Sequence, residues 1–347
     1  MGERLNIAVL GASGYTGADM VRLALGHPRL RIAALAGDSK AGRPLAEIYP
    51  HLGFYDLPVL QKAEEIAWDG VDAVFGCLPH GASEEILSRL PERLAIIDLS
   101  ADFRLQDPGV YAQWYGRAHA SPQLLPGAVY GLTEWARPKL RSARLAACPG
   151  CYPTAVLLAL LPLVQSGILS LEDVIIDAKS GVSGAGRSLK EQNLFCEAGE
   201  SLKAYGVGAH RHMPEIEQEL SRAAGLDVRV NFTPHLVPMS RGELVTCHVR
   251  LAPGRSLEDA RATLRAASKD EPFVHLAPEG LAPSTAHVRG SNHCLVNVFA
   301  DRLPGRIIVI AAIDNLVKGS AGQALQNLNV MLGFPETQGL EQPPLFP

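Results

Sequence analysis

Cys151 lies in a sequence context that favours a reactive thiol. Residues 147–154 follow a short apolar run, and the apolar segment 155–164 after them is typical of a buried helix. Because Pro153 suits the first position of a helix, we expect Cys151 just before the first turn. The unpaired N–H groups and the positive end of the helix dipole at that position favour the nucleophilic thiolate. The alternative is a small buried apolar residue, as many cysteines outside disulfides are.

A second group of reactive side chains comprises His210, Arg211 and His212, just before a helix that should start near Pro214. An imidazole can move protons near neutral pH, and a guanidinium can bind a carboxylate or phosphate through two hydrogen bonds. The Cys-x-x-Cys pair at 148–151 could join the histidines as metal ligands, but the sequence lacks the usual second ligand pair. We therefore predict no metal site. The context of a thioredoxin-like redox pair is also missing.

Residues 11–17 have the composition of a dinucleotide-binding turn. A strand-like run covers residues 5–10, and a helical pattern begins at Ala18. Glycines in such a turn let backbone N–H groups approach a pyrophosphate at the start of the helix. The spacing is G-x-x-G-x-x-G rather than the commoner G-x-G-x-x-G, and an ordinary tight turn is the alternative. The cofactor-binding residues predicted here are Gly11, Ser13, Gly14, Tyr15, Thr16 and Gly17.

The end of the second predicted strand, residues 31–36, gives opposing signals about the coenzyme. Asp38 would bind the ribose 2′-hydroxyl of NAD, whereas Ser39, Lys40 and Arg43 would accommodate the 2′-phosphate of NADP. We favour NADP because the donors outnumber the acidic residue. The alternative is that these polar residues form an ordinary solvated loop.

The first part of the chain alternates between strand and helix patterns. Buried strands are predicted at 71–77 and 94–99, with a helix between them at about 83–90. This alternation predicts a parallel sheet joined by right-handed crossovers. Ligands bind beyond the carboxyl ends of the strands in such sheets. The crevice should therefore be lined by Leu78, Pro79 and Ser100.

The second part of the chain has a different pattern. Period-two alternation at 242–251 and 295–299 and continuous apolar strands indicate a mixed, largely antiparallel sheet. Residues 180–187 form a second glycine-rich loop, which could bind phosphate or be a plain flexible turn. The fold class is thus an N-terminal Rossmann-type doubly wound α/β sheet followed by an α+β catalytic and dimerisation domain.

The predicted domain boundaries follow from these patterns. Turns dominate residues 107–131, which we predict to be a connecting region. The cofactor domain should comprise residues 1–148, with an amphipathic C-terminal helix in 315–347 returning to it, and the catalytic domain residues 149–314.

Composition narrows the classes of partner. The chain has 347 residues, 20% charged and 47% hydrophobic, with a net charge of −4, so it lacks the basic surface of a nucleic-acid binder. No apolar stretch is long enough to span a bilayer, and six scattered cysteines without a secretory signal argue against a disulfide framework. We expect a soluble, cytoplasmic protein that acts on small molecules.

Six motifs together resemble the N-acetyl-gamma-glutamyl-phosphate reductase family, the arginine-biosynthesis relatives of aspartate-semialdehyde dehydrogenase. They occur in family order along nearly the whole chain: GASGYTG at 11–17, SADFR at 100–104, PGCYPT at 149–154, SGVSGAGR at 180–187, HRHMPEI at 210–216 and DNLVKG at 314–319.

The resemblance implies a nicotinamide-linked, phosphorylating aldehyde dehydrogenase that reduces an acyl phosphate. It implies that Cys151 is the nucleophile, that His212 transfers protons, and that the enzyme is a homotetramer. It also implies NADP, bound by the 11–17 turn, by Ser39, Lys40 and Arg43, by the Ser183–Gly184 loop, and by Asn315 near the nicotinamide. Position and chemistry suggest residues for the substrate's carboxylate, phosphate or amide: Arg104, Ser180, Tyr205, His210 and Arg211.

The sequence departs from the family pattern at two places. Cys148 stands where the family usually has Asn, and we interpret it as a packing residue, with a reversible Cys148–Cys151 disulfide as the alternative. Asp38 and Lys40 replace the usual Ser-Arg pair. Alternative functions are the same chemistry on aspartyl phosphate or carrier-linked aminoadipyl phosphate, and a non-catalytic NADP-sensing regulator.

Overall fold

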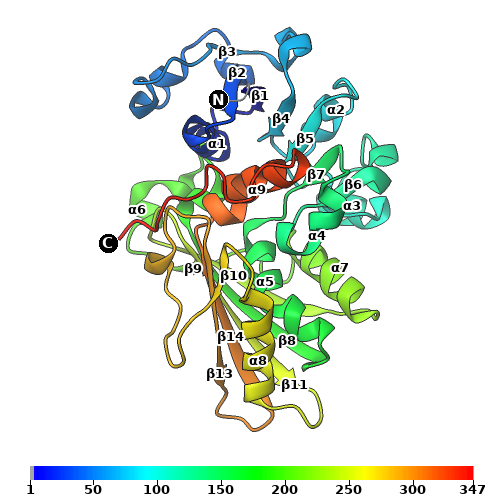
Figure 1. Ribbon diagram of the computed structural model, residues 1–347. Coiled ribbons are helices and arrows are strands. Elements are labelled where there is room, and N and C mark those ends of the chain that lie inside the picture. The colour runs from blue at the N-terminus through cyan, green and yellow to red at the C-terminus, as the bar shows by residue number, and fades with distance from the viewer. Residues whose placement is uncertain (1–3, 347) are drawn as a thin grey trace. The chain divides into compact units, whose positions relative to one another are not determined.

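The computed structural model describes residues 4–346, and the chain divides into two compact units (Figure 1). Unit 1 comprises Met1–Pro149 and Ser320–Glu341, and unit 2 comprises Gly150–Gly319 and Gln342–Pro347. The chain therefore enters unit 2 one residue before Cys151. Two segments that the sequence assigned to the cofactor domain, residues 315–319 and the stretch from Gln342 onward, belong to unit 2, and Pro149, assigned to the catalytic domain, belongs to unit 1.

Unit 1 is built on a seven-stranded parallel sheet with the strand order β3-β2-β1-β4-β5-β7-β6. This confirms the predicted doubly wound, Rossmann-type class. The order reverses between β1 and β4, and in open parallel sheets the ligand crevice lies at that switch point. The elements of this unit are β1 (Leu5–Leu10), α1 (Tyr15–Gly26), β2 (Leu30–Ala36), β3 (Leu60–Gln61), β4 (Ala73–Gly76), α2 (Ser83–Leu87), β5 (Ala95–Asp98), α3 (Pro108–Tyr115), β6 (Ala128–Tyr130), α4 (Thr133–Leu140), β7 (Leu145–Ala147) and α9 (Gly322–Met331).

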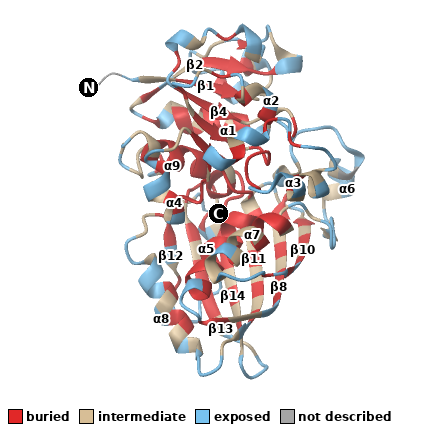
Figure 2. Ribbon diagram, turned by 90° about the vertical axis from the view of Figure 1, so that its right-hand side faces the viewer, coloured by how far each residue is buried: buried red, intermediate tan, exposed pale blue. Residues whose placement is uncertain are grey.

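The central strands of unit 1 are continuous apolar runs because the sheet is covered on both faces. Ile7 to Leu10 of β1 and Ala73 to Phe75 of β4 have no exposed surface, and Figure 2 shows both strands as buried. Parallel strands with both faces covered lose the alternation of apolar and polar residues that marks a half-exposed sheet. The sheet is thus a rigid base for the turns at its carboxyl edge.

Glycines shape the turn after β1. Gly11 has φ +73°, a left-handed conformation, and a Cβ there would lie 2.1 Å from the Cys77 carbonyl oxygen. A Cβ on Gly17, in the first turn of α1, would lie 2.3 Å from the Gly11 carbonyl oxygen. The two glycines therefore let the turn and the start of α1 pack directly on each other and on the end of β4.

The last helix, α9, completes unit 1 with an unusual set of buried amides. It packs against α1, α4 and β5. The Asn327 amide donates to the Gly131 carbonyl oxygen over 2.8 Å, and Gln323 donates to the same oxygen over 3.1 Å. Buried amides are stable where they have such partners. The predicted amphipathic segment thus forms a helix whose polar side is buried as well as its apolar side.

One prediction for unit 1 was wrong. Residues 107–131 were expected to be a connecting region of turns, but they form α3 and the edge strand β6. Asp107 caps α3 by accepting hydrogen bonds from the N–H groups of Gly109 and Val110, and Pro108 takes the first helical position. This Asp-Pro start is a regular helix signal, which the surrounding glycines and prolines obscured.

Unit 2 contains a seven-stranded mixed sheet with the order β12-β13-β14-β11-β8-β10-β9, in which four of the six neighbouring pairs are antiparallel. The predicted mixed, largely antiparallel sheet is confirmed. Its elements are α5 (Cys151–Gln165), β8 (Leu169–Gly181), α6 (Phe195–Ala198), β9 (Lys203–Ala204), α7 (Met213–Ala224), β10 (Val230–Val237), β11 (Glu243–Leu251), α8 (Leu257–Ser268), β12 (Val274–Leu276), β13 (Cys294–Ala300) and β14 (Arg306–Ile313).

Helix α5 is the core of unit 2. Every residue from Tyr152 to Val164 is buried, and the helix packs against α7, α8 and strands β8, β11 and β14. The strands alternate between buried and half-buried residues, which Figure 2 shows as red and tan stripes on β8 and β14. One face of the sheet therefore carries the helices.

Within residues 4–346 no helix combines the length and apolar character needed to cross a bilayer.

Two glycines of α1 provide a matched test of the turn after β1. Gly17→Ala should lower the free energy of unfolding by about 2 kcal/mol or more, because the new methyl group meets backbone atoms that cannot move independently. Gly26→Ala, at the end of the same helix with no atom within 4 Å of its Cβ position, should be neutral or stabilising by up to about 1 kcal/mol. Urea denaturation measures both. Equal effects would mean that the close packing at Gly17 is not what constrains the turn.

Candidate active site

Cys151 is the first residue of α5 and follows the N-cap residue Gly150. The sequence had placed it just before the helix, with Pro153 as the first residue; Pro153 is instead the third. The consequence for the thiol is the same, because the N–H groups of the first helical turn have no partners within the helix and the positive end of the dipole lies there. Gly319 packs so closely that a Cβ on it would lie 2.8 Å from the Cys151 Cβ.

Glu215 connects the start of α5 to the start of α7. Its carboxylate accepts a hydrogen bond from the Gly150 N–H over 2.8 Å, and the side chain is 1% exposed. Hydrogen bonds to a charged partner are short and strong, and they are stronger still when buried. This residue was not predicted as a site residue, although it lies within the HRHMPEI motif. It fixes the position of the first turn of α5, and with it Cys151.

The two histidines of the motif lie at the same end of unit 2. His212 is the N-cap residue of α7, and its ring centre lies 5.8 Å from that of Tyr152, the residue after Cys151. The rings of His210 and His212 are 4.7 Å apart and nearly perpendicular. The structure therefore brings the predicted nucleophile and the predicted proton carrier to the first turns of two helices that pack on each other.

His210 and His212 differ in what they can do. Burial, and next the charge of Arg211, lower the pKa of His210 to about 4, so its imidazole is neutral at physiological pH. Its Nδ1 accepts a hydrogen bond from the His212 backbone N–H over 3.2 Å. His210 thus positions the backbone of His212 and stays in its neutral form.

The predicted substrate residues of unit 2 differ in exposure. Tyr205 donates a hydrogen bond to the Tyr152 hydroxyl over 3.3 Å, and Tyr152 donates to the His235 carbonyl oxygen over 3.2 Å. Burial raises the pKa of both phenols, so both stay neutral. Arg211 is exposed. Tyr205 is therefore part of a chain of hydroxyls beside Cys151, whereas Arg211 can reach an anion from solvent.

The second glycine-rich loop is held by Asn315. Its side-chain oxygen accepts from the Gly242 N–H over 2.9 Å, and its Nδ2 donates to the Ser183 hydroxyl over 2.9 Å. A Cβ on Gly184 would lie 2.9 Å from the buried Ser180 hydroxyl. Four predicted residues thus lie together in unit 2: Ser180 at the end of β8, Ser183 and Gly184 in the loop that follows it, and Asn315 just after β14.

The predicted dinucleotide residues gather at the carboxyl edge of the unit 1 sheet. Gly11 packs on Cys77, directly before Leu78 and Pro79, and a Cβ on Gly37 at the end of β2 would lie 3.3 Å from the Ser13 hydroxyl. Ser39 and Lys40 lie in a short 3₁₀ turn after β2, where Ser39 is exposed. Arg43 is also exposed and donates to the Glu47 carboxylate over 2.7 Å.

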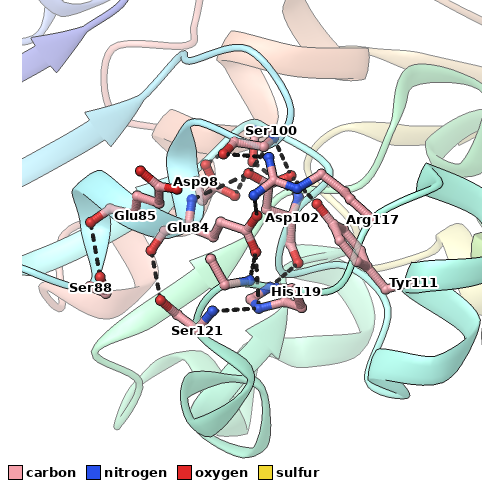
Figure 3. Close-up of polar contacts among 12 residues, drawn as sticks. Glu84, Glu85, Ser88, Asp98, Ser100, Asp102, Tyr111, Arg117, His119 and Ser121 are labelled. Atoms are coloured by element: carbon pink, nitrogen blue, oxygen red, sulfur yellow. Dashed lines mark hydrogen bonds and ion pairs between the residues drawn. The ribbon is translucent and has the colours of Figure 1, made fainter.

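A buried polar network supports the loop that follows β5 (Figure 3). The Ser100 hydroxyl donates to Asp98 over 2.7 Å, and Asp102 accepts from the Gly81 N–H over 2.9 Å and from the Tyr111 hydroxyl over 2.9 Å. Nearby, the buried Glu84 carboxylate pairs with Arg117 over 2.6 Å and contacts His119 over 3.1 Å. The Ser100 hydroxyl therefore stabilises the conformation of its own loop.

Arg104 and Cys148 are also engaged within unit 1. The Arg104 guanidinium donates to the carbonyl oxygens of Cys148 over 2.8 Å and Leu99 over 3.0 Å, at the ends of two neighbouring strands. The Cys148 thiol is buried, which raises its pKa to about 12, and it accepts from the Asn327 amide over 3.5 Å. Its environment is that of an inert packing residue rather than a reactive thiol.

Glu243 is a site residue that the sequence analysis did not predict. It is the first residue of β11, it has no exposed surface, and its carboxyl interacts with the Cys151 thiol. Burial raises the pKa of this carboxyl to about 8. Alternation at 242–251 identified the strand, but it gave no signal that its first residue would face the cysteine.

The hydrogen bond from Gly150 to Glu215 can be tested by substitution. Glu215→Ala should lower the free energy of unfolding by about 2–3 kcal/mol, because a buried N–H loses its charged acceptor. Glu219→Ala, on the same helix, removes a carboxylate paired with a solvent-facing Arg222 and should cost about 0.5 kcal/mol. Urea denaturation of both variants distinguishes a specific loss at the start of α5 from a general loss in α7.

The raised pKa of Glu243 predicts a pH-dependent stability. Below its unfolded value of 4.5 the carboxyl is protonated in both states, and between 4.5 and about 8 only the folded state keeps the proton, so stability falls as pH rises through this window. Glu243→Gln lacks this titration. The melting temperature of the variant relative to the parent should therefore rise from pH 5 to pH 8.5, and parallel melting curves across that range would contradict the assignment.

Comparisons with known proteins agree with this geometry. The family described as "Semialdehyde dehydrogenase, NAD binding domain" matches residues 6–143, and "Semialdehyde dehydrogenase, dimerisation domain" matches residues 151–315. Among solved structures, aspartate semialdehyde dehydrogenase II of Vibrio cholerae has a TM-score of 0.72 at 17% identity over 96% of this chain and 99% of that one. The aspartate semialdehyde dehydrogenase of Candida albicans, solved with NADP, has a TM-score of 0.70 at 18% identity over 95% and 98%. These structures share the fold.

Curated relatives are much more similar in sequence. The chain is 56% identical to an N-acetyl-gamma-glutamyl-phosphate reductase of Rhodospirillum rubrum, with 100% of both chains covered. It is 53% identical to a probable chloroplastic N-acetyl-gamma-glutamyl-phosphate reductase of Oryza sativa, with 100% of this chain and 83% of the relative covered. With two semialdehyde dehydrogenase domains and relatives this similar over its full length, the chain is an oxidoreductase that belongs to the N-acetyl-gamma-glutamyl-phosphate reductase family.

Proposed function

We propose that this protein reduces N-acetyl-gamma-glutamyl phosphate with NADPH to N-acetylglutamate 5-semialdehyde and phosphate, a step of arginine biosynthesis in the cytoplasm. The observation that carries the proposal is the placement of Cys151 in the first turn of α5. The next residue, Tyr152, packs its ring against the imidazole of His212, and the chain is 56% identical to a relative of that name.

Cys151 supplies the nucleophile. Its thiolate attacks the carbonyl carbon of the acyl phosphate, a C–S bond forms, the C–O bond to phosphate breaks, and phosphate leaves with the bonding electron pair. The acyl group then remains on the enzyme as a thioester. N–H groups in the first turn of α5 have no partners within the helix and would stabilise the oxygen that becomes negative in the tetrahedral intermediates, which lowers the barrier.

The residues of unit 1 fit a nicotinamide dinucleotide. The N-cap residue Gly14 has no side-chain hydrogen bond, the first turn of α1 carries no acidic residue, and Gly11 and Gly17 keep the turn free of side-chain bulk. Such a helix start accepts a pyrophosphate. Ser39 and Lys40 support NADP, with Arg43 beside them but shared with Glu47. The chemistry that a bound nicotinamide supplies is a hydride for the thioester carbon.

His212 handles the proton of the second half of the reaction. After reduction, the oxygen on the former carbonyl carbon is an alkoxide of a thiohemiacetal, and the imidazole exchanges a proton with it as the C–S bond breaks and the aldehyde leaves. His210 keeps the backbone of His212 in place and stays neutral. The Ser183–Gly184 loop, tied to Asn315, supports the nicotinamide end of the coenzyme.

The candidate residues for binding the substrate's anionic groups differ in how exposed they are to solvent. Arg211 is exposed and offers a bidentate cation, while Ser180 offers a buried hydroxyl and Tyr205 a half-buried one. Arg104 is a weaker candidate for binding substrate than the sequence suggested, because its guanidinium already donates to two main-chain carbonyl oxygens.

A coupled assay in the phosphorylating direction tests the function. With phosphate and NADP, the parent should oxidise N-acetylglutamate semialdehyde, use NAD poorly, and leave aspartate semialdehyde nearly untouched. Cys151→Ser should lose at least about 10³-fold in kcat, because a hydroxyl is a poor nucleophile at neutral pH. Cys196→Ser, at an exposed cysteine in the same unit, is the matched control and should keep full activity.

The same assay addresses the alternatives. Turnover of aspartate semialdehyde alone would assign the aspartyl phosphate reaction, and turnover of a carrier-linked aminoadipate semialdehyde alone would assign the lysine-pathway reaction. Coenzyme binding without turnover of any of these aldehydes would identify a regulator.

We also propose that the chain self-associates through unit 2, as a dimer or a tetramer. The match to a dimerisation domain supports this, and so does the sheet face away from the helices, where apolar side chains are only half-buried: Ile175, Leu244, Ile308 and Ile310. Sedimentation equilibrium measures the mass of the assembly.

A further inference from the structure

A basic pocket of unit 2 is formed by residues that the proposed reaction does not use. It has a volume of about 510 Å³ and lies between α8 and the segment that contains β12, which pack against each other (Figure 2). We call it the α8 pocket, and its charged lining residues are three cations and one acid: Arg261, Arg265, Lys269 and Glu279. Because the whole chain has a net charge of −4, this excess of positive charge is local to the pocket.

Arg261 is a buried cation that has only neutral partners. The residue is 6% exposed, and no carboxylate within residues 4–346 forms an ion pair with it. One terminal nitrogen of its guanidinium donates to the Asn297 side-chain oxygen over 2.9 Å, and the other donates to the Ala277 carbonyl oxygen over 3.2 Å. A guanidinium has five N–H donors, and a buried charge normally has a counter-ion. Arg261 therefore lines the α8 pocket with donors and charge that an anion would satisfy.

Asn297 fixes the orientation of the Arg261 guanidinium. This amide on β13 has no exposed surface, and its nitrogen donates to the carbonyl oxygens of Pro278 over 3.0 Å and Leu281 over 2.7 Å. These two bonds direct its oxygen toward Arg261. The guanidinium is thus held in place before any ligand arrives, which reduces the entropy lost on binding.

Arg265 and Lys269 continue the basic face of α8. They follow Arg261 at intervals of four residues, so the three side chains share one face at steps of about 6 Å along the helix. Arg265 lies 4.0 Å from the carboxylate of Glu258, and both side chains are mostly exposed, which makes this a weak pair. Attraction to the negative end of the helix dipole explains cations near the end of α8, but it does not extend back to the buried Arg261.

The rest of the lining adds polar and apolar contacts without further positive charge. His275 on β12 shares a hydrogen bond with His293, from Nε2 to Nδ1 over 2.9 Å, and burial lowers its pKa, so its imidazole is neutral at physiological pH. Leu276 and Pro278 supply apolar surface. The three cations span about 12 Å of helix, which is more than one phosphate group can contact. A ligand with several linked phosphate groups matches that spread and the volume of the α8 pocket.

We propose that the α8 pocket binds a small anion with two or more linked phosphate groups, either inorganic or as part of a nucleotide. Arg261 provides the buried, oriented guanidinium, which suits phosphate oxygens because its N–H groups form a planar fork. Arg265 and Lys269 provide the remaining positive charge at the solvent side. None of these residues has a place in the proposed reaction, so the binding site is independent of it.

Isothermal titration calorimetry of the full-length protein tests the site, in salt of about 0.15 M so that long-range attraction between exposed charges is screened. The probes are inorganic triphosphate, ATP and inorganic phosphate. The parent should bind one triphosphate per chain, at least tenfold more tightly than inorganic phosphate. Tighter binding of ATP than of triphosphate would identify a nucleotide as the ligand, and weaker binding would identify the inorganic anion. Saturation with NADP should change the affinity for triphosphate less than twofold.

Three variants assign the binding to the α8 pocket. Arg265→Ala with Lys269→Ala removes two exposed cations of the pocket and should weaken triphosphate binding at least tenfold. Arg255→Ala with Arg302→Ala removes the same charge from exposed positions of unit 2 outside the lining and should weaken it less than twofold. Arg261→Lys keeps the charge but loses the planar fork and should weaken binding severalfold. Circular dichroism checks the fold of each variant, and the two double variants give the answer if Arg261→Lys folds poorly.

Four results would overturn the proposal. They are no binding of triphosphate by the parent, equal losses in the two double variants, competition between triphosphate and NADP, and binding of inorganic phosphate as tight as that of triphosphate. Sedimentation equilibrium of the Arg265→Ala, Lys269→Ala variant adds a fifth, because a smaller assembly with unchanged triphosphate affinity would make the pocket a contact between copies of the chain. Expected triphosphate binding by a protein that turns over no acyl phosphate would refute the proposed function alone.

Discussion

The hydrogen bond between the Gly150 N–H and the Glu215 carboxylate determines where the chemistry of unit 2 takes place. It satisfies the N-cap amide of α5 with a buried charge that belongs to α7. Cys151 follows Gly150 directly, and His212 precedes Glu215 by three residues, so one contact sets the relative position of the thiol and the imidazole. The apolar length of α5 is then what keeps this arrangement rigid, since a helix buried on all sides cannot rotate without opening cavities.

The residues around that contact either exchange protons or stabilise the structure of the site. His210 is a neutral acceptor for a backbone N–H, and Tyr152 carries a phenol whose raised pKa keeps it neutral. Glu243 is the exception, because burial raises the pKa of its carboxyl to about 8 and the carboxyl interacts with the Cys151 thiol. The site thus combines a fixed framework with a small number of mobile protons, which is the usual requirement for general acid–base chemistry.

Much of this organisation could be predicted from the sequence because it depends on local patterns. The Gly11–Gly17 turn, the apolar strands and the helix after Pro149 are each determined by neighbours in the chain, and their classes were predicted correctly. The residues that were missed depend on distant partners. Glu215 acts on an amide 65 positions away, and Glu243 faces a cysteine brought near by the fold; neither relation leaves a periodic signal. The helix α3 was missed for a local reason, because glycine and proline at its start also read as turn residues.

The division of unit 1 into two chain segments has a consequence for biosynthesis. The amides of α9 fill the space under Gly131 and reach Cys148, yet α9 is made only after the whole intervening unit 2 sequence. At usual rates of synthesis, the ribosome needs roughly ten to forty seconds to extend the chain from Pro149 to the end of this segment. During that interval the surfaces of α1, α4 and β5 that α9 covers, and the Gly131 carbonyl oxygen, lack their partners, so unit 1 cannot complete its fold before unit 2 has been synthesised.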